Sequence, residues 1–354
     1  MRIFDYSSLK EKTWDCEIIS LVAQIHEYKG RQEVYLKQKP EALDKLIEIA
    51  KRQSTEASNA IEGIRTTSTR LKQLCEEKTT PKNRDEEEIL GYRDVLNTIH
   101  ENYEYIPIRT NYILQLHRDL YKYTGKSIGG HFKVSQNVIA ATDEDGKEYV
   151  LFTPLEPYET PSAIDSICEN YNRMIESEDV DSILLIPIFV HDFLCIHPFS
   201  DGNGRMSRLL TALLLYKSGY VVGKYISIEN KIAGNKDLYY KALEDCQEGG
   251  YENKEDVTPF VKYMLRVILA SYRDFEERVE LVSEKLPAKE IVKRAIYSKM
   301  GKLSKSDIVE LCPSIGIKSV ELALKQLAEE GAILKKGSGR ATFYVRSDSQ
   351  YNNN

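Results

Sequence analysis

The stretch of sequence that decides the fold reads His197-Pro198-Phe199-Ser200-Asp201-Gly202-Asn203-Gly204-Arg205-Met206-Ser207-Arg208. We predict a helix, a loop and a second helix around it, because an apolar run covers 183–196 and an amphipathic run covers 209–217. Gly202, Asn203 and Gly204 tolerate positive φ, which turns successive backbone N–H groups toward one point, and a helix N-terminus follows at once. The loop is therefore predicted to cradle an anion.

The same twelve residues carry side chains suited to chemistry on a phosphate. Arg205 and Arg208 are three positions apart on a helix, so they share a face and can bracket phosphate oxygens. Asp201 offers a hard oxygen ligand to Mg²⁺, which needs only one or two carboxylates besides phosphates and water. His197, whose ordinary pKa is about 6.5, can take a proton from an incoming hydroxyl at neutral pH. Together these groups predict attack on a nucleotide phosphate.

The stretch matches the signature HxFx(D/E)GNGRxxR at every defined position, and on it the chain resembles the Fic (Fic/Doc) family. Other features look like parts of the Fic core: Leu116-His117, residues 130–138, Pro187 opening the helix before the motif, and residues 235–243. Lys133 stands where many members of the family carry Arg. The resemblance covers roughly residues 105–275.

The resemblance implies a protein adenylyltransferase, which transfers AMP from ATP to a Tyr, Thr or Ser hydroxyl of a protein and releases pyrophosphate. It implies a base at His197, a Mg²⁺ ligand at Asp201 and an inward-pointing loop anchor at Phe199. The implied contacts to the ATP phosphates are Gly202, Asn203, Gly204, Arg205 and Arg208. Tyr239 and Tyr240 would line the adenine side, although they can also be simple core aromatics.

A β-hairpin is predicted at 134–153, where β-prone runs at 134–141 and 148–153 flank Asp145-Gly146. In the family this hairpin is a flap that binds a target segment by strand addition, so the resemblance implies a protein target as partner. The chain's 23 tyrosines also offer acceptors for self-modification. The alternative explanation for their number is a general amino-acid bias of the source.

An inhibitory helix is predicted at about 54–63, with Gly63 as its C′ residue and a turn separating it from the helical pattern at 43–49. Residues 58–63 fit (S/T)xxxE(G/N), the family's inhibitory pattern. Ser58 and Glu62 are four positions apart and share a helix face, so Glu62 can pair with Arg208 while Ser58 meets the same surface. The resemblance implies an intramolecular inhibitor that acts on the orientation of ATP more than on its affinity.

Composition sets the limits for the class of protein. The 354 residues are 42% hydrophobic and 29% charged, which is typical of a folded chain. The six cysteines lack metal-binding spacing, the first residues lack an export signal, and the run at 183–196 is too short and too polar to span a bilayer. We therefore expect a cytoplasmic protein with free thiols and no membrane attachment.

We predict a mostly α-helical fold in three parts. These are an N-terminal helical region with the inhibitory helix at 1–104, a Fic-type core with the flap and the motif at 105–284, and a winged helix-turn-helix at 285–354. An acidic run at 85–88 predicts a helix N-terminus, since negative charge suits the macrodipole there.

The last part is more basic than the rest and raises the question of a DNA partner. DNA phosphates can be contacted from two places in this part. These are the predicted recognition helix, with Lys318 and Lys325, and the wing, with Lys335, Lys336 and Arg340. Glu321, Glu329 and Glu330 share that helix, so a role in protein interaction or in a homo-oligomer fits the sequence equally well.

Several alternatives stay open at this point. The same site can transfer UMP or phosphocholine, or remove AMP with Glu62 positioning a water, because the base, the cradle and the metal ligand are shared. A DNA-binding regulator with a nucleotide-sensing core is an alternative of another class. A metal-dependent phosphohydrolase using His191, Asp192, His197 and Asp201 is disfavoured, since the two histidines are six positions apart and the cradle would have no role. We expect His191 to be structural.

Overall fold

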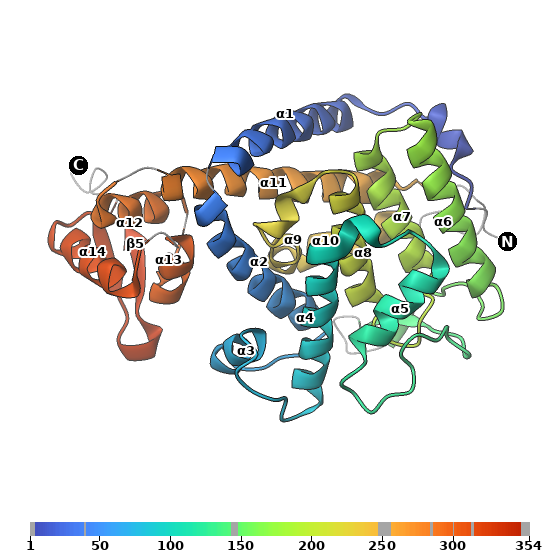
Figure 1. Ribbon diagram of the computed structural model, residues 1–354, viewed down its shortest axis with the longest axis horizontal. Coiled ribbons are helices and arrows are strands. Elements are labelled where there is room, and N and C mark those ends of the chain that lie inside the picture. Colours follow the sequence, from blue (N-terminus) through green and yellow to red (C-terminus); the bar gives the residue numbers. More distant parts are fainter. Residues whose placement is uncertain are drawn as a thin grey trace. The chain divides into compact units, whose positions relative to one another are not determined.

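The computed structural model describes residues 4–38, 40–142, 148–246, 256–283, 286–299, 301–312 and 315–347 (Figure 1). These residues form two compact units: one combines the chain up to residue 29 with residues 50–271, and the other combines residues 30–49 with the chain from residue 272 onward. Helices dominate both units, so the predicted mostly α-helical class is confirmed. The three-part division at 104 and 284 stays a prediction.

The chain before the hairpin is helical. Its elements are η1 (Ser7–Lys10), α1 (Cys16–Gln38), α2 (Pro40–Ile61), α3 (Ser68–Cys75), α4 (Arg84–Asn102), η2 (Tyr103–Tyr105) and α5 (Thr110–Leu120). Asn83 caps α4 by accepting a hydrogen bond from the N–H of Glu86, and the acidic run of the sequence follows it as predicted.

Helix α2 differs from its prediction at one end and agrees at the other. The helix expected from Ser54 begins at Pro40, because the intervening residues are good helix formers with no glycine or proline, so the expected turn does not form. At its C-terminus Gly63 has a φ of 80°, and the N–H groups of Gly63 and Ile64 donate to the carbonyls of Ala60 and Asn59. This Schellman motif confirms Gly63 as the C′ residue.

The helices after the hairpin build the remaining core of the first unit. They are α6 (Thr160–Ser177), α7 (Ser182–Ile196), α8 (Asn203–Lys217), η3 (Val221–Lys224), α9 (Ile228–Gly234), α10 (Lys236–Asp245) and α11 (Thr258–Ser283), the last of which continues into the second unit. Almost every residue of α7 is buried, as its apolar run predicts. Pro187 lies inside α7 and does not open it. The helix begins earlier because the Asp181 carboxylate accepts a hydrogen bond from the N–H of Ile183.

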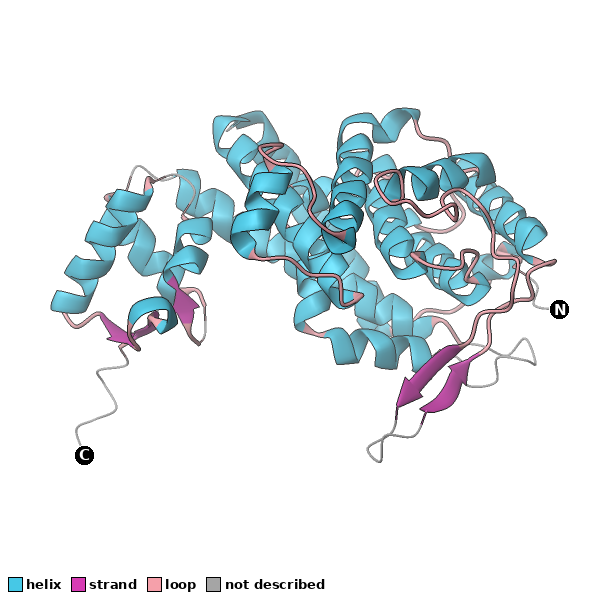
Figure 2. Ribbon diagram, turned by 90° about the horizontal axis from the view of Figure 1, so that it is seen from below, coloured by secondary structure: helices cyan, strands magenta, loops and turns pink. Residues whose placement is uncertain are grey.

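The hairpin consists of β1 (Ile139–Thr142) and β2 (Glu148–Phe152), which pair antiparallel and project from the helices (Figure 2). The predicted first strand is too long, because residues 134–138 are held to other loops instead. Within them the side chains of Gln136 and Asn137 donate to the carbonyls of Pro154 and Phe199. The predicted turn at Asp145-Gly146 lies outside the described residues.

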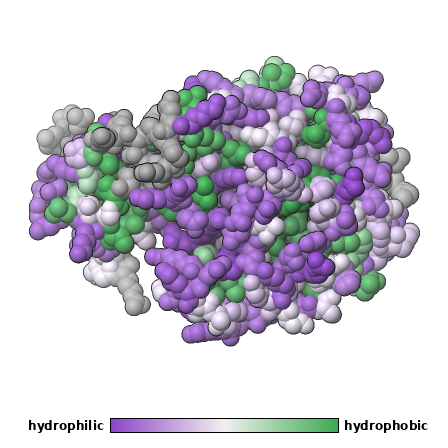
Figure 3. Space-filling view, viewed as in Figure 1, coloured by the Kyte–Doolittle hydropathy of each residue, from purple (hydrophilic) through white to green (hydrophobic). Residues whose placement is uncertain are grey.

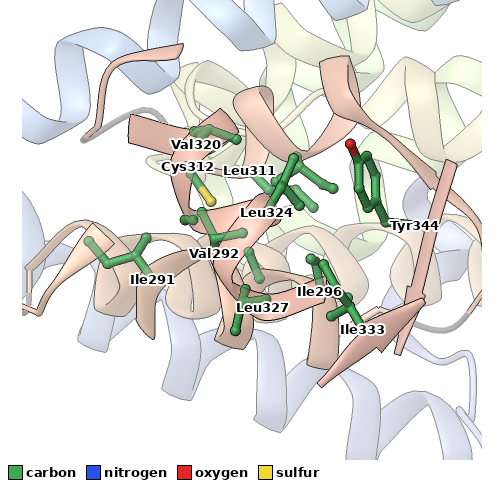
Figure 4. Close-up of a cluster of buried hydrophobic side chains, with 13 residues drawn as sticks. Ile291, Val292, Ile296, Leu311, Cys312, Val320, Leu324, Leu327, Ile333 and Tyr344 are labelled. Carbon is green, nitrogen blue, oxygen red and sulfur yellow. The ribbon is translucent and has the colours of Figure 1, made fainter. Parts of the chain in front are cut away.

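The C-terminal part of the second unit packs three helices against a small sheet. Its elements are α12 (Ala288–Tyr297), β3 (Leu303–Ser304), α13 (Lys305–Leu311), α14 (Ile317–Glu329), β4 (Ile333–Lys336), η4 (Gly339–Ala341) and β5 (Phe343–Arg346). The sheet order is β3-β5-β4, and β3 was missed by the sequence prediction because it has only two residues. The apolar core of this C-terminal part includes Val292, Leu324 and Ile333 (Figure 4). The helices and the hairpin follow the order predicted for a winged helix.

Hydrophilic residues cover most of the surface in the view of Figure 3, and hydrophobic residues lie between them. Among the helices of the described ranges, none combines the length and the apolar character that crossing a bilayer requires.

Candidate active site

His197 lies at the junction between α7 and the loop. It ends α7 in the left-handed region with a φ of 50°, and its N–H donates to the carbonyl of Phe193 at 2.9 Å. Burial lowers the pKa of the imidazole to about 4. The ring is therefore neutral at pH 7, which is the form that can accept a proton.

The loop after His197 is fixed from inside by Phe199. Its buried ring stacks on His117 with a centroid separation of 3.6 Å. Its N–H donates to the side-chain oxygen of Asn203 at 2.9 Å, and the Asn203 amide donates back to its carbonyl at 2.7 Å. The side chain of Asn203 therefore shapes the loop, which leaves its backbone as the group that can face an anion.

His117 on α5 holds the next turn of the loop. Its Nδ1 accepts a hydrogen bond from the N–H of Gly130, so Nε2 carries the proton and donates to the carbonyl of Asp201 at 3.0 Å. Gly202 follows with a φ of 83°, and a Cβ built there would lie 2.8 Å from the Tyr121 hydroxyl. Glycine is required at 202 both for the backbone conformation and for the space.

A cavity of about 330 Å³ opens beside His197. Six of its lining residues are predicted site residues, namely Glu62, His197, Gly204, Arg208, Tyr239 and Tyr240. The hairpin side contributes Val138, Ile139 and Phe152. The α7 and α10 sides contribute Leu194, Cys195, Tyr239, Tyr240, Leu243 and Glu244. The lining thus combines charged and aromatic side chains, which suits a molecule with an anionic group and a flat ring.

The Arg208 guanidinium is held by Ser58 near the end of α2 and by Glu62 just beyond it. Its Nε donates to the Ser58 hydroxyl at 2.8 Å, and its Nη2 donates to the Ser58 carbonyl at 2.9 Å and to Glu62 Oε1 at 2.7 Å. A Cβ built on Gly204 would overlap the same Glu62 oxygen. The Glu62 carboxylate, 32% exposed, therefore lies against the N-terminal turn of α8 as well as on the guanidinium.

Two further contacts fasten the end of α2 to the core. The Ser54 hydroxyl donates to the buried Glu229 carboxylate at 2.6 Å. Lys236 Nζ, at the start of α10, donates to the carbonyl of Ile61 at 2.8 Å, where the helix leaves its last carbonyls without partners. These two contacts hold the last turns of α2, which lead into Glu62.

Arg205 points elsewhere. Its buried guanidinium donates to the Tyr121 hydroxyl at 2.7 Å and lies 2.8 Å from Glu88 Oε2. Arg205 and Arg208 are three positions apart on α8, so their side chains start from neighbouring parts of the helix surface. The buried Glu88 carboxylate holds Arg205 away from the cavity, and of these two arginines only Arg208 lines it. A contact between Arg205 and ATP stays a prediction.

Tyr239 and Tyr240 both line the cavity but differ in exposure. Tyr239 is buried and packs edge-on against Phe260 and Tyr263 at centroid distances of 5.9 and 5.7 Å. Tyr240 is 40% exposed, and partial burial raises the pKa of its hydroxyl to about 12. Both phenols are therefore neutral at pH 7, and Tyr240 offers the more accessible ring.

Asp201 lies outside the cavity lining and faces solvent with 44% of its side chain exposed. Burial of its other atoms tends to raise its pKa, but Lys126 and Arg205 outweigh this and lower the pKa below its usual range. In the described part of the chain no three His, Cys, Asp or Glu gather into a metal site. A single ionised carboxylate fits Mg²⁺ that takes its other ligands from phosphates and water.

Comparison with known proteins places this geometry in a family. The family model for the Fic/DOC family matches residues 107–215. Residues 107–215 therefore carry a Fic/DOC family region. A Fido domain-containing protein of Dictyostelium discoideum is 27% identical over 147 residues, which are 40% of this chain and 98% of that protein.

Adenylyltransferases occur among the relatives of this Fic protein. The protein adenylyltransferase Fic of Drosophila erecta is 26% identical over 184 residues, 50% of this chain and 31% of that protein. A probable protein adenylyltransferase of Aquifex aeolicus is 33% identical over 98 residues, 28% of this chain and 27% of that protein. The chain thus matches only about a third of the length of these two enzymes.

Solved structures share the fold. A Fic family protein from Desulfovibrio desulfuricans is 20% identical and superimposes with a TM-score of 0.62, over 95% of this chain and 98% of that one. A Fic domain-containing signaling protein from Bacteroides thetaiotaomicron is 24% identical with a TM-score of 0.60, over 75% of this chain and 97% of that one.

The Fic site also contains residues that the sequence analysis did not single out. Leu243 and Glu244 follow Tyr240 by three and four positions, so the helical spacing of α10 already places them on the same face. Lys126 and Glu88 carry no such signal, because they meet Asp201 and Arg205 only through the tertiary fold.

Proposed function

We propose that this chain is a protein adenylyltransferase that transfers AMP from ATP to a Tyr, Thr or Ser hydroxyl, and that Glu62 restrains it. The observation that carries the proposal is one cavity that combines the neutral His197 imidazole, the N-terminal turn of α8, Arg208 and the aromatic face of α10. The names of the adenylyltransferase relatives support the same reaction class.

The proposed reaction needs one proton acceptor and one set of anion contacts. The acceptor hydroxyl gives its proton to His197 as its oxygen attacks the α-phosphorus of ATP. The bond between the α-phosphorus and the oxygen that bridges it to the β-phosphate breaks, and pyrophosphate leaves with the electron pair. Backbone N–H groups at the start of α8 and the Arg208 guanidinium hold phosphate oxygens. Mg²⁺ bound at Asp201 would supply positive charge to the phosphates.

The restraint follows from competition between two anions for Arg208. While Glu62 pairs with the Arg208 guanidinium and lies against Gly204, the terminal phosphate of ATP can contact neither the guanidinium nor the N-terminal turn of α8. ATP then binds without the contact that aligns its α-phosphorus with the acceptor, and a misalignment of about 1 Å is enough to slow transfer on the order of a hundredfold.

A protein target is proposed to bind at the hairpin. The strands β1 and β2 pair only with each other in the described sheet, so each has an outer edge available for a third strand. Val150, on β2, is 60% exposed beside that edge. Such backbone pairing would present a hydroxyl to His197 with little demand on the target's sequence.

The experiment compares ATP labelled at the α- and at the γ-phosphate as donors to protein, with Mg²⁺. We expect label from the α-position only, with incorporation roughly tenfold stronger or more in Glu62→Gly and absent in His197→Ala. His26→Ala is the matched control, because this exposed histidine pairs with Asp181 away from the cavity.

The other outcomes separate the alternatives. If Glu62→Gly binds ATP but transfers no α-label to itself or to a lysate, another donor or the removal of AMP becomes the better proposal. If neither the wild type nor Glu62→Gly binds ATP, nucleotide transfer by this chain is excluded.

A further inference from the structure

Glu88 on α4 is a buried carboxylate with no part in the proposed reaction, and its residue is only 2% exposed. Its Oε1 accepts hydrogen bonds from Arg84 Nε at 2.8 Å and from Lys126 Nζ at 3.2 Å. Its Oε2 lies 2.8 Å from Arg205 Nη2. Three cations around one carboxylate leave an excess of positive charge beside it.

Asp201 is the second carboxylate in contact with the same three cations. Lys126 Nζ donates to its Oδ2 at 2.9 Å. Arg205 Nη2 lies 3.8 Å from its Oδ1, and Arg84 Nη2 lies 4.0 Å from its Oδ2. The carboxylate predicted to bind Mg²⁺ therefore already has one oxygen, Oδ2, in contact with an ammonium group.

Lys126 is not needed to place Asp201. The backbone of Asp201 is fixed by the hydrogen bond from His117 to its carbonyl and by the left-handed conformation of Gly202 after it. Lys126 itself is 25% exposed and has other partners within reach, namely Glu88 Oε1 at 3.2 Å and the face of the Tyr121 ring at 5.1 Å. Its ammonium can therefore leave Asp201 without losing all its partners.

We propose that Lys126 is a resident counter-cation of the metal ligand: a divalent cation binds Asp201 only by displacing the Lys126 ammonium, which Glu88 then retains. The inference rests on the proposed role of Asp201 as the metal ligand. Lys126 is thus a positioning residue, which acts on the metal through Asp201.

The charges make this displacement conditional on the nucleotide. Glu88 and Asp201 carry two negative charges against three positive ones on Arg84, Lys126 and Arg205, so a free divalent cation enters a site that is already positive. Bound phosphates reverse the sign of the site. Divalent metal alone should therefore bind weakly, and metal together with nucleotide should bind well.

The test measures Mn²⁺ binding to the full chain without nucleotide, by the electron paramagnetic resonance signal of free Mn²⁺. Lys126→Met removes the ammonium and should tighten Mn²⁺ binding about tenfold, whereas Lys126→Arg keeps the charge and should bind as the wild type does. Lys122→Met is the matched control, because Lys122 lies on the same segment and pairs with Asp94 instead. Asp201→Asn combined with Lys126→Met should abolish the gain.

Mn²⁺ binding by Lys126→Met that is equal to or weaker than that of the wild type overturns the inference, and so does a gain of the same size in Lys122→Met. Lys126→Gln is measured alongside, with thermal melts of each variant, so that a misfolded protein is not mistaken for a negative result. Binding of labelled ATP in EDTA to Glu62→Gly separates the two proposals. Tighter Mn²⁺ binding without ATP binding upholds the role of Lys126 and overturns AMP transfer from ATP. ATP binding without tighter Mn²⁺ binding overturns the role of Lys126 and leaves AMP transfer standing.

Discussion

Gly204 is the residue at which the proposed inhibitor and the anion cradle meet. A side chain there would overlap Glu62 Oε1 and would come within 3.1 Å of Glu62 Cδ and 3.3 Å of Arg208 Nη1. Its φ is not positive, so space and not backbone strain is what requires glycine at this position. Because the obstacle is a side chain, removing that side chain should remove the requirement.

We therefore predict that the cost of Gly204→Ala depends on residue 62. In the wild type the new methyl must push the Glu62 carboxylate off Arg208, at a cost of about 1–3 kcal/mol in the free energy of unfolding. In Glu62→Gly the same substitution should cost less than about 0.5 kcal/mol. Urea denaturation of the four proteins of this cycle, followed by circular dichroism, measures both values, and equal costs in the two backgrounds would contradict the contact.

Much of the site around His197 and Arg208 was predictable at the scale of single residues. The motif from His197 to Arg208 and the pair of Ser58 and Glu62 are local patterns whose spacing carries meaning. The pairing of Arg205 with Glu88 was not predictable, because Glu88 lies more than a hundred positions earlier, in a run of four acidic residues that look alike in the sequence. Burial sets Glu86 and Glu88 apart from the other residues of that run, and only Glu88 contacts Arg205. Sequence spacing does not report burial by distant elements.

At the scale of elements, α2 joins two parts of the chain that the sequence suggested were separate helical segments. It runs without interruption from Pro40 to Ile61 and carries Ser58 in its last turns, with Glu62 just beyond its end. Three contacts stabilise that end: the Schellman motif at Gly63, the hydrogen bond from Lys236 to the Ile61 carbonyl, and the hydrogen bond from Ser54 to Glu229. The orientation of Glu62 therefore depends on how well the helix terminus is closed.

Opening this terminus should activate the protein. Gly63→Ala places a side chain at a φ of 80° without any steric overlap, which costs about 1 kcal/mol through backbone strain alone. We expect faster amide hydrogen exchange at residues 59–64 and a few-fold more α-label incorporation from ATP. Gly30→Ala, on α1 and also without neighbours within 4 Å, is the control and should change neither. Unchanged exchange at 59–64 in Gly63→Ala would show that this terminus does not govern Glu62.

At the scale of the whole molecule, the order of elements was more predictable than their grouping. Helices, hairpin and C-terminal sheet follow the predicted sequence of elements. The two compact units, however, combine residues 30–49 with the chain from residue 272 onward, and no local pattern reports such a pairing of distant segments. Among the lysines predicted to contact DNA, Lys325 lies 3.8 Å from Glu329, so part of the basic surface is already neutralised, and DNA contact stays a prediction.

Buried histidines should make the stability of the chain depend on pH. Burial lowers the pKa values of His100, His117 and His197 to about 3, 4 and 4, from an ordinary value of 6.5. Between pH 6.5 and about pH 4 the unfolded chain binds these protons and the folded chain does not, so the free energy of unfolding falls as the pH falls through this window. Glu86, with a pKa of about 2, adds to the loss only below its usual pKa of 4.5.

Thermal melts at pH 7 and pH 5 should therefore differ, with a melting temperature lower at pH 5 by roughly 5 °C or more. His100→Phe provides the matched comparison. It removes one of the three titrating groups and one hydrogen bond, between the Tyr216 hydroxyl and His100 Nε2. The variant's melting temperature should fall less between the two pH values than that of the wild type. A melting temperature that stays constant or rises on acidification would mean that these imidazoles reach water in the folded state, and that burial does not hold the pKa of His197 below its ordinary value.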